Sequence, residues 1–459
     1  MTNKIALETI ERNRDTFIKI SREIWEHPET AFNEKFASKI LSDYLKEQGF
    51  EVELGYLGIP TAIRAVWGNG KPIIGMLAEY DALPGLSQKM CAEKDPVEPG
   101  APGHGCGHHA IAVCKLAAAV ALKTEMEERK LPGTVVFYGC PAEETVAGKV
   151  MMAREGAFRE LDLAFAWHPM QTNEVYNCRW SGLNSAKFHF SGISAHAGFD
   201  PYNGRSALDA VELMNVGANY LREHVTDDVR IHYAITNGGV VPNIVPDKAS
   251  VWYYVRALSR EAVTDTYDRL IKVAKGAAMM TDTNVEIEFI GGCYNTVPNK
   301  ELVRLVHETM QEIPSPEWTA EEVEFCKKLN DTCAPYKQML ASGAVAEGTH
   351  IADSIPEPTT QNSFASTDVG DVMHIVPTAF FATACTNLGA SAHSWQFAAA
   401  TGSDVGMKGM LYAAKIIAVS AVKAIEDSSI VERAKADFDK MMNGKSYVCP
   451  MPADMTLPN

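Results

Sequence analysis

The 459-residue sequence lacks the features that mark export, membrane insertion or nucleic-acid binding. Residues 1–25 contain no uninterrupted apolar block and no small-residue cleavage site, so no secretory signal is expected. No apolar run approaches the roughly 20 residues that a membrane-spanning helix needs. The formal charge of −16 is not offset by any basic stripe. Neither nucleic acid nor a membrane is therefore an expected partner.

The spacing of the cysteines is not that of a disulfide-rich protein. The ten cysteines are scattered singly, without CxxC pairs. Such thiols are typical of a reducing compartment, which predicts a cytoplasmic protein. Hydrophobic residues make up 46% of the chain and charged residues 22%, as in soluble globular proteins. A chain of this length exceeds what one core supports, which predicts about two or three domains.

Helix-like and strand-like stretches alternate in the first part of the sequence. Helices are predicted over residues 4–26 and 109–128, and strands over 61–67, 73–79, 134–138 and 163–167. This alternation favours an α/β fold in which a mixed sheet is flanked by helices. A further apolar helix is predicted over 406–425. Residues 311–363 carry prolines, Trp318 and charged helix-like patches. The sequence gives them no definite role, although a stretch of this length beside a site can cover it.

Between residues 181 and 294 the order changes to βαββαβ. Strands are predicted over 185–192, 229–236, 248–257 and 284–291, and helices over 205–224 and 260–281. This is the order of the ferredoxin-like unit, which can fold on its own. We therefore expect residues 181–294 to be an inserted lid or dimerisation domain. Residues 1–180 and 295–459 are expected to form the catalytic domain, with a hinge at the two crossings.

A Gly-rich stretch, GHGCGHHAIAVCKLAAAVA (residues 103–121), places Cys106 and His108 directly before a predicted helix. Residues i and i+2 of an extended turn point to the same side, so a thiolate and an imidazole can converge on one metal ion. Taken alone, Cys-Gly-His is equally compatible with a flexible loop and a buried cysteine. Residues elsewhere in the chain decide between these interpretations.

Further polar residues follow other predicted strands. Glu143 and Glu144 follow GTVVFYGC, and adjacent residues of an extended backbone point in opposite directions. One carboxylate can thus bind metal while the other faces an attacking water. His168 ends the strand LDLAFAWH, His393 follows TAFFAT, and Asp81 follows IIGMLAEY. Because sites of α/β sheets assemble beyond the carboxyl ends of the strands, we expect five ligands to converge: Cys106, His108, Glu144, His168 and His393.

The motifs GCGH, PAEE, the strand-end histidine and the late AHS, taken together in their order, resemble a known family. It is that of the dinuclear metallopeptidases that include aminoacylase, carboxypeptidase G and plant auxin-conjugate amidohydrolases. The segments AEYDALPG, STDVGDV and SAHSWQF are most similar to its aminobenzoyl-glutamate hydrolase branch. The resemblance covers nearly the whole chain and implies a metal-dependent hydrolase of amide bonds.

The resemblance also implies roles for individual residues. Cys106 would bridge two divalent metal ions, with the other four ligands completing the pair. Glu143 would be the general base, and Asp81 a supporting carboxylate that orients a ligand. Two positions depart from the wider family pattern. His109 stands where relatives commonly carry Asp or Asn, so an additional ligand or altered surroundings stay open, and Glu79 replaces a ligating histidine of other branches.

The inserted domain contributes GISAHAG (192–198) and GGVVPNIVPDKA (238–249), which resemble the family's lid motifs. By resemblance His196 donates to the developing oxyanion, Asn243 holds the substrate and Arg256 binds its carboxylate. From the residues alone, each is equally compatible with a turn or a surface ion pair. The family's habit also implies a homodimer formed through the inserted domain. His104, His350 and His374 are left without a role.

The substrate implied by the resemblance is an N-acyl or N-aroyl amino acid with a free carboxylate, such as aminobenzoyl-glutamate; a dipeptide is the alternative. Thiolate and imidazole ligands favour zinc, and the remaining ligands also accept manganese. Two other classes of function stay open. Cys106 with a neighbouring histidine is compatible with a nucleophilic thiol pair. The second class is a catalytically silent metal-binding subunit, because the enzyme that the chain most resembles contains two kinds of subunit.

Overall fold

The computed structural model describes residues 4–456 and contains two β-sheets. The larger sheet has seven strands in the order β1-β2-β4-β3-β5-β11-β6. Strands β4, β3, β5 and β11 run parallel, whereas β1, β2 and β6 pair antiparallel with their neighbours. The bounds of these strands are β1 Glu51–Leu54, β2 Ile63–Asn69, β3 Ile73–Glu79, β4 Gly133–Cys140, β5 Leu163–Met170, β6 Glu174–Val175 and β11 Thr378–Ala384. The expected mixed sheet is confirmed.

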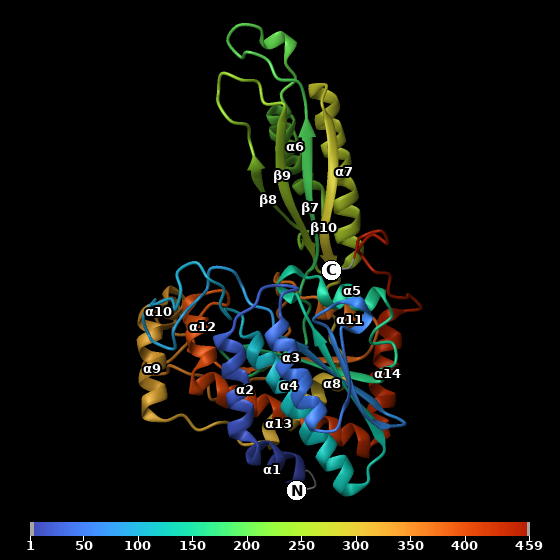
Figure 1. Ribbon diagram of the computed structural model, residues 1–459, viewed down its shortest axis with the longest axis vertical. Coiled ribbons are helices and arrows are strands. Elements are labelled where there is room, and N and C mark those ends of the chain that lie inside the picture. Colours follow the sequence, from blue (N-terminus) through green and yellow to red (C-terminus); the bar gives the residue numbers. More distant parts are fainter. Residues whose placement is uncertain (1–3, 457–459) are drawn as a thin grey trace.

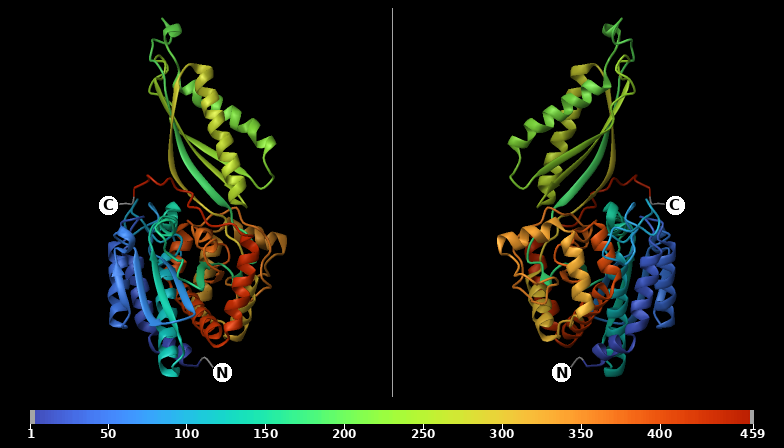
Figure 2. Two further views of the ribbon diagram at one scale, coloured as in Figure 1. Left: turned by 90° about the vertical axis from the view of Figure 1, so that its right-hand side faces the viewer. Right: turned by 90° about the vertical axis from the view of Figure 1, so that its left-hand side faces the viewer.

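Helices cover both faces of this sheet (Figures 1 and 2). On one face, apolar residues of the strands pack against α3, α4, α8 and α13, and α1, α2 and α14 pack against these helices. On the other face they pack against the short helices α5 and α11. The bounds are α1 Lys4–Arg12, α2 Arg14–Glu26, α3 Lys35–Glu47, α4 His108–Arg129, α5 Gly148–Arg154, α8 Lys300–Glu312, α11 Val369–Met373, α13 Asp404–Glu426 and α14 Ser428–Met442.

One predicted helix is divided in the structure. Residues 4–26 form α1 and α2, which meet at Asn13, not a continuous helix. The Asn13 side-chain amide donates to the carbonyl of Thr9 at 2.9 Å. Asparagine side chains compete with the backbone for hydrogen bonds and thereby interrupt helices.

Helix α13 is long and apolar enough to cross a membrane by length and composition alone. However, 89% of its most apolar window is buried inside the structure. It packs against α4 and β11 at the centre of the larger core. Its apolar character is therefore accounted for by burial within the protein.

Residues 311–363, in which the sequence shows charged helix-like patches, contain two helices. These are α9 (Ala320–Asp331) and α10 (Ala334–Ser342), which form a small separate core with residues near Leu388 and Val405. Helix α9 begins with a capping box between Thr319 and Glu322, an N-terminal signal that satisfies two backbone N–H groups. The following segment, up to α11, has no regular structure and runs beside the larger sheet. Helix α12 (Trp395–Gly402) lies between β11 and α13.

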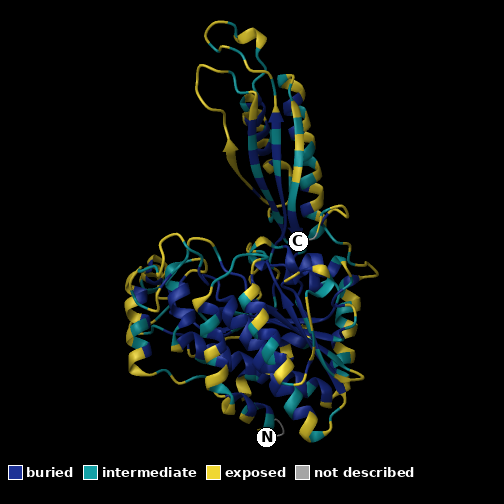
Figure 3. Ribbon diagram, viewed as in Figure 1, coloured by how far each residue is buried: buried dark blue, intermediate teal, exposed yellow. Residues whose placement is uncertain are grey.

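The second sheet stands away from the first, with four strands in the order β10-β7-β9-β8 (Figure 1). Its elements follow one another as βαββαβ: β7 Gly182–Ser191, α6 Ala207–Leu221, β8 Arg230–Asn237, β9 Lys248–Ala257, α7 Arg260–Thr281 and β10 Asn284–Cys293. Both helices pack on one face and enclose a core of their own. Burial is greatest around the larger sheet, whereas the far loops of the smaller unit are exposed (Figure 3).

Candidate metal centre and substrate cavity

The carboxyl ends of four parallel strands meet at one edge of the larger sheet. Asp81 follows β3, Glu143 and Glu144 follow β4, His168 lies near the end of β5, and His393 follows β11. Parallel strands present their carboxyl ends on the same side. Residues far apart in the chain therefore approach one another here, and Nε2 of His393 lies 3.3 Å from Oε2 of Glu144.

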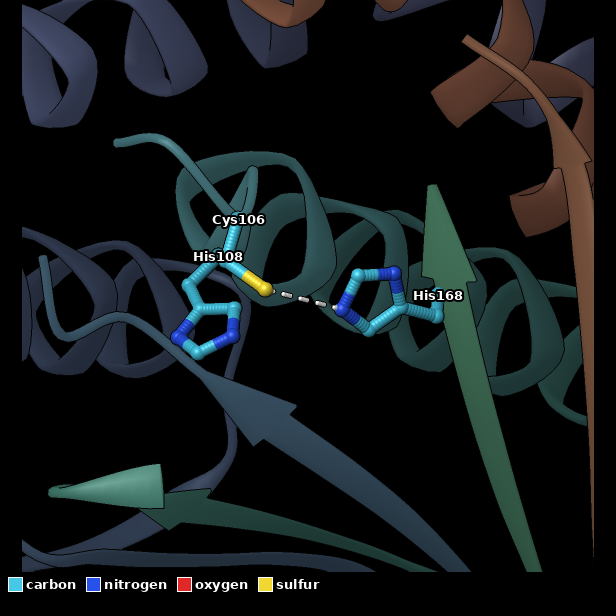
Figure 4. A group of neighbouring side chains, drawn as sticks. All are labelled: Cys106, His108 and His168. Carbon is cyan, nitrogen blue, oxygen red and sulfur yellow. Dashed lines mark hydrogen bonds between the residues drawn. The ribbon is translucent and has the colours of Figure 1, made fainter. Parts of the chain in front are cut away.

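Cys106 and His108 reach the same edge from the turn that precedes α4. Gly107 between them has a φ of 76°, a left-handed value that glycine adopts without strain. A Cβ atom at this position would lie 2.7 Å from Cγ of Pro169. Cys106 Sγ lies 3.2 Å from Nε2 of His168, and the sulfur points between the two imidazoles (Figure 4).

Potential ligand atoms form three groups among the described residues: two share Cys106, and the third consists of Glu79, His108 and Glu143. Of the two that share Cys106, one contains Cys106, His108 and His168, and the other contains Cys106, Glu144 and His393. Within each group the ligand atoms lie within 4.8 Å of one another. Thiolate, imidazole and carboxylate are the ligands that divalent transition metals prefer. The arrangement fits two neighbouring cations that share one thiolate.

The electrostatics of the cluster also fit cations. Nε2 of His108 and Oε1 of Glu144 are buried and make no hydrogen bond within residues 4–456. Burial, followed by repulsion from Glu79, raises the pKa of Glu143 to about 8. Burial also raises the pKa of Glu144 to about 7. Positive charge at this position would partner the orphaned atoms and offset the repulsion between carboxylates.

Asp81 connects the histidine to the Glu-Glu turn. Its Oδ1 accepts from Nδ1 of His108 at 2.8 Å, and its Oδ2 accepts from the backbone N–H of Glu144 at 2.9 Å. The first bond places the imidazole proton on Nδ1 and directs the lone pair of Nε2 toward the cluster. Metal-binding histidines commonly make such a bond to a carboxylate on the opposite nitrogen.

The turn that carries Glu143 and Glu144 is bracketed by two residues with left-handed backbone. Ala142 has a φ of 56° and Val146 a φ of 49°, a region that side chains other than glycine rarely adopt. Glu34, fully buried before α3, accepts from the N–H of Ala142 at 2.9 Å. Burial raises the pKa of Glu34 to about 7. The sequence does not point to Glu34, because no local pattern links it to a turn 108 residues away.

A second buried ion cluster lies beside the candidate metal centre. Nζ of Lys149 contacts Oε1 of Glu79 at 2.7 Å and also pairs with Asp368. The backbone N–H of Lys149 donates to the same Asp368 carboxylate at 2.8 Å. Oε2 of Glu79 lies 3.8 Å from Nε2 of His108. The sequence assigns no role to Lys149 and Asp368, since only their packing reveals the pair.

A cavity of about 1000 Å³ extends from this cluster to the smaller unit. Its aromatic lining consists of Trp167, Tyr176, Trp180, Trp252, Tyr254 and Phe380. Thr359 and Gln361 to Ser363 also line it, so the end of the 311–363 segment borders the cavity. Strand alternation places Trp252, Tyr254 and Arg256 on the face of β9 opposite to α6 and α7.

Arg256 is the guanidinium that lines this cavity. Its Nη1 donates to Oγ of Ser366 at 2.8 Å, and its Nε donates to Nε2 of His232 at 3.3 Å. Within residues 4–456 no carboxylate forms an ion pair with it. Burial lowers the pKa of Arg256. A half-buried cation without an acidic partner is well placed to receive an anionic group.

His196 and Asn243 do not line the cavity. Both are exposed, on the segments 192–206 and 238–247 that form the far end of the smaller unit in Figure 1. The two are adjacent there: the N–H of Ala197 donates to the carbonyl of Asn243 at 3.0 Å, and Nδ1 of His196 accepts from the N–H of Phe199 at 3.0 Å. Within one chain, His196 and Asn243 therefore lie apart from the candidate metal-binding side chains.

Four histidines to which the sequence assigns no definite role make contacts outside the ligand groups: His104, His109, His350 and His374. Nε2 of His109 lies 3.2 Å from the carbonyl of Thr401, and its ring packs near that of His104. Nδ1 of His350 lies 3.0 Å from the hydroxyl of Tyr336, and Nδ1 of His374 lies 2.9 Å from the carbonyl of Gly370. Among the described residues, none of the four belongs to the groups that can hold a metal.

Comparison with known proteins places the chain in a family. The family model for peptidase family M20/M25/M40 matches residues 75–326. One of the subunits of p-aminobenzoyl-glutamate hydrolase from Escherichia coli K12 is 39% identical over 467 residues, covering 98% of this chain and 97% of that protein. The chain belongs to peptidase family M20/M25/M40. It is accordingly a hydrolase of amide bonds.

Other M20/M25/M40 relatives extend the comparison. The Xaa-Arg dipeptidase of Homo sapiens is 28% identical over 468 residues, covering 96% of this chain and 93% of that protein. Among solved structures, the YXEP protein of Bacillus subtilis, a dinuclear metal-binding peptidase of family M20, has a TM-score of 0.60 and 19% identity. The likeness covers 90% of this chain and 99% of that one and shows a shared fold. A two-metal centre fits both this fold and the two ligand groups around Cys106.

Proposed function

We propose that this chain is a cytoplasmic amidohydrolase that cleaves N-acyl or N-aroyl amino acids with a free carboxylate, p-aminobenzoyl-glutamate first among them. One observation carries the proposal: a single cavity joins the ligand groups around Cys106 to the unpaired Arg256. A substrate that spans it offers its amide to the metal centre and its carboxylate to the guanidinium. The similarity to the E. coli enzyme named for this substrate supports the choice.

The metal-binding roles are proposed from the two ligand groups that share Cys106. Cys106 is proposed as the shared ligand, His108 and His168 as the other ligands of one cation, and Glu144 and His393 as those of the second. We propose Zn or Mn, because thiolate and imidazole favour the former and carboxylate accepts the latter. When bound, such cations polarise the scissile carbonyl and lower the pKa of the attacking water.

The protein's own groups are proposed to move the proton. Glu143 accepts it from the attacking water and returns it to the leaving amine, and burial next to the cavity raises the pKa of this carboxyl toward the operating pH. Asp81 keeps His108 oriented through the 2.8 Å bond to Nδ1. The reaction needs no covalent acyl-enzyme, which separates it from a thiol mechanism at Cys106.

We expect two divalent cations per chain in protein purified without chelator. Elemental analysis checks the number of cations. The activity is checked by measuring the release of p-aminobenzoate from p-aminobenzoyl-glutamate. Removal of the cations should abolish turnover, and adding Zn or Mn back should restore it. Full activity in metal-free protein, lost on alkylation of Cys106, would support the nucleophilic thiol instead.

Two further candidates concern substrate and subunits. The human Xaa-Arg dipeptidase relative favours a dipeptide of the same chemistry, which the same assay tests with dipeptide substrates. The E. coli relative is named as one subunit of its enzyme, so a second kind of subunit is the other candidate. Turnover by the purified single chain would argue against a silent partner role.

We propose that residues 181–294 act as a lid and form a homodimer. Strand β8 is an edge of its sheet, and α6 exposes Leu213, Val216 and Tyr220 along one side. Exposed edges and apolar stripes favour pairing with a second copy. His196 and Asn243 lie apart from the cavity of their own chain. To contact a substrate they require either closure of the lid or the approach of the second copy, whose cavity they would then enter.

The dimer is tested by light scattering on the full chain. We expect a dimer, and we expect Val216→Glu together with Tyr220→Glu to shift it toward monomer, because two buried carboxylates oppose an apolar contact. Lys272→Glu, on the neighbouring helix α7, is the charge-reversal control. A wild-type monomer would contradict the proposal, and a dimer that survives both glutamates would place the interface elsewhere.

A further inference from the structure

One carboxylate lines the cavity apart from the metal-binding cluster. Among the described residues of the lining, the other acidic side chains are Glu79, Glu143 and Glu144, which surround His108. Glu174 lies instead on β6, a short edge strand. Within residues 4–456 no lysine or arginine forms an ion pair with it. A half-buried carboxylate thus faces the cavity without a cation.

The strand register fixes where this carboxylate lies. His168 pairs with Ala382 across β5 and β11, and Ala382 pairs with Glu174 across β11 and β6. Residues that pair directly across neighbouring strands project from the same face of a sheet. The side chains of His168 and Glu174 therefore point to the same side, with one strand between them.

The separation follows from the spacing of strands. Adjacent strands lie about 4.8 Å apart, so the backbones of His168 and Glu174 are roughly 10 Å apart. The residue between them is Ala382, which is fully buried. Tyr176 and Phe380 line the cavity with ring centroids 4.8 Å apart. They form an apolar platform on the same face of the sheet as His168 and Glu174, two residues along the strands from them.

Burial raises the pKa of Glu174, and a hydrogen bond from the side chain of Thr359 opposes this rise. Thr359 itself is held beside β6, because its N–H donates to the carbonyl of Val175 at 3.0 Å. The carboxylate has two oxygens and several acceptor positions, so Thr359 leaves it able to accept from a ligand. The backbone of Glu174 is held in the edge strand of the sheet, whose partner is β11.

The geometry points to Glu174 as the residue that selects the acyl group, by accepting a hydrogen bond from an amine at the end remote from the scissile carbonyl. This inference rests on the proposed function, in which Arg256 holds the carboxylate of the amino acid. The cavity then has a partner for each end of the substrate: a cation for the acid and an anion for the amine. The preferred substrate class is a flat acyl group with a terminal N–H donor.

This placement also disfavours simple dipeptides. An α-amino group lies only about 2.5 Å from the carbonyl carbon of its own residue, too near the metal centre to reach Glu174. A para-substituted ring places its amine on the far side of the ring, over the platform formed by Tyr176 and Phe380. The hydrogen-bond donor to Glu174 is either a neutral aromatic amine or a protonated alkyl amine. Comparing substrates that carry one or the other distinguishes the two.

The test compares three amides of glutamate on the metal-loaded enzyme: 4-aminobenzoyl, benzoyl and 4-(aminomethyl)benzoyl. We expect Glu174→Leu to lower kcat/KM for the 4-aminobenzoyl amide by about 10- to 100-fold, the loss typical of a hydrogen bond to a charged group. The benzoyl amide, which has no amine, should change less than about 3-fold. A larger loss on the aminomethyl amide would identify the donor as an ammonium group.

Two further variants sharpen the result. Glu174→Gln retains an acceptor oxygen and should recover part of the discrimination. Glu357→Leu removes an exposed acid of the neighbouring segment, outside the cavity lining, and should leave all three rates unchanged. Equal loss on the amine-bearing and amine-free amides, or no loss on either, would overturn the role of Glu174. Failure of the wild-type enzyme to cleave any of the three would instead overturn the proposed function.

Discussion

Glu143→Gln is expected to lower turnover by about 100- to 10,000-fold, the usual contribution of a positioned general base. The amide has nearly the same shape as the carboxylate. The described side-chain hydrogen bonds of the turn are made by Asp81, Glu34 and Thr145, not by Glu143. The variant should therefore fold normally and keep both cations. Measuring bound metal and kcat on the same preparation separates loss of the base from loss of the site.

Glu144→Gln provides the matched comparison. Oε2 of Glu144 lies 3.3 Å from Nε2 of His393, and its Oε1 is a buried atom without a partner among the described residues. As a proposed ligand, it should lose metal as well as rate, because an amide oxygen is a weaker ligand than a carboxylate. Metal loss from Glu143→Gln with retention in Glu144→Gln would mean that the two roles are exchanged. If both variants kept full activity, the site would lie elsewhere.

Lys149→Met is expected to lower the free energy of unfolding by about 3–5 kcal/mol, the cost of leaving buried charges without their partner. Lys149 is 0% exposed and pairs with both Glu79 and Asp368. Methionine matches the length of the stem but leaves two buried carboxylates facing each other. Denaturant unfolding of the metal-free protein measures the effect without a contribution from bound cations.

Two comparisons define this expectation further. Combining Lys149→Met with Asp368→Asn should cost less than the sum of the single changes, because the second substitution removes one of the stranded charges. Lys435→Met removes a lysine whose pair with Asp439 is 67% and 59% exposed, and should change stability by less than about 0.5 kcal/mol. Equal effects of Lys149→Met and Lys435→Met would show that the buried cluster contributes nothing specific.

Elements that depend on local pattern are specified by neighbouring residues. The bounds of β3, β9 and α7 agree with those predicted, because the apolar run of β3, the alternation of β9 and the periodicity and capping serine of α7 are local features. The order of motifs also identified five side chains that meet at one edge of the sheet. Glu144, His168 and His393 come there from the carboxyl ends of parallel strands, and Cys106 and His108 from the turn before α4. The helical break at Asn13 was not predicted, because it consists of a departure of the backbone angles at one residue, with φ −99° and ψ 11°.

Which distant residues support and extend that edge depends on the packing of the whole chain. Glu34 and Lys149 acquire their significance from partners 108 and 219 residues away, and Glu174 from a strand register that no local pattern encodes. The same packing places His196 and Asn243 apart from the cavity, because both lie on loops at the far end of the smaller unit. Contacts of this kind depend on how complete elements pack, and packing is a property of the whole chain, whereas periodicity and capping act over a few residues.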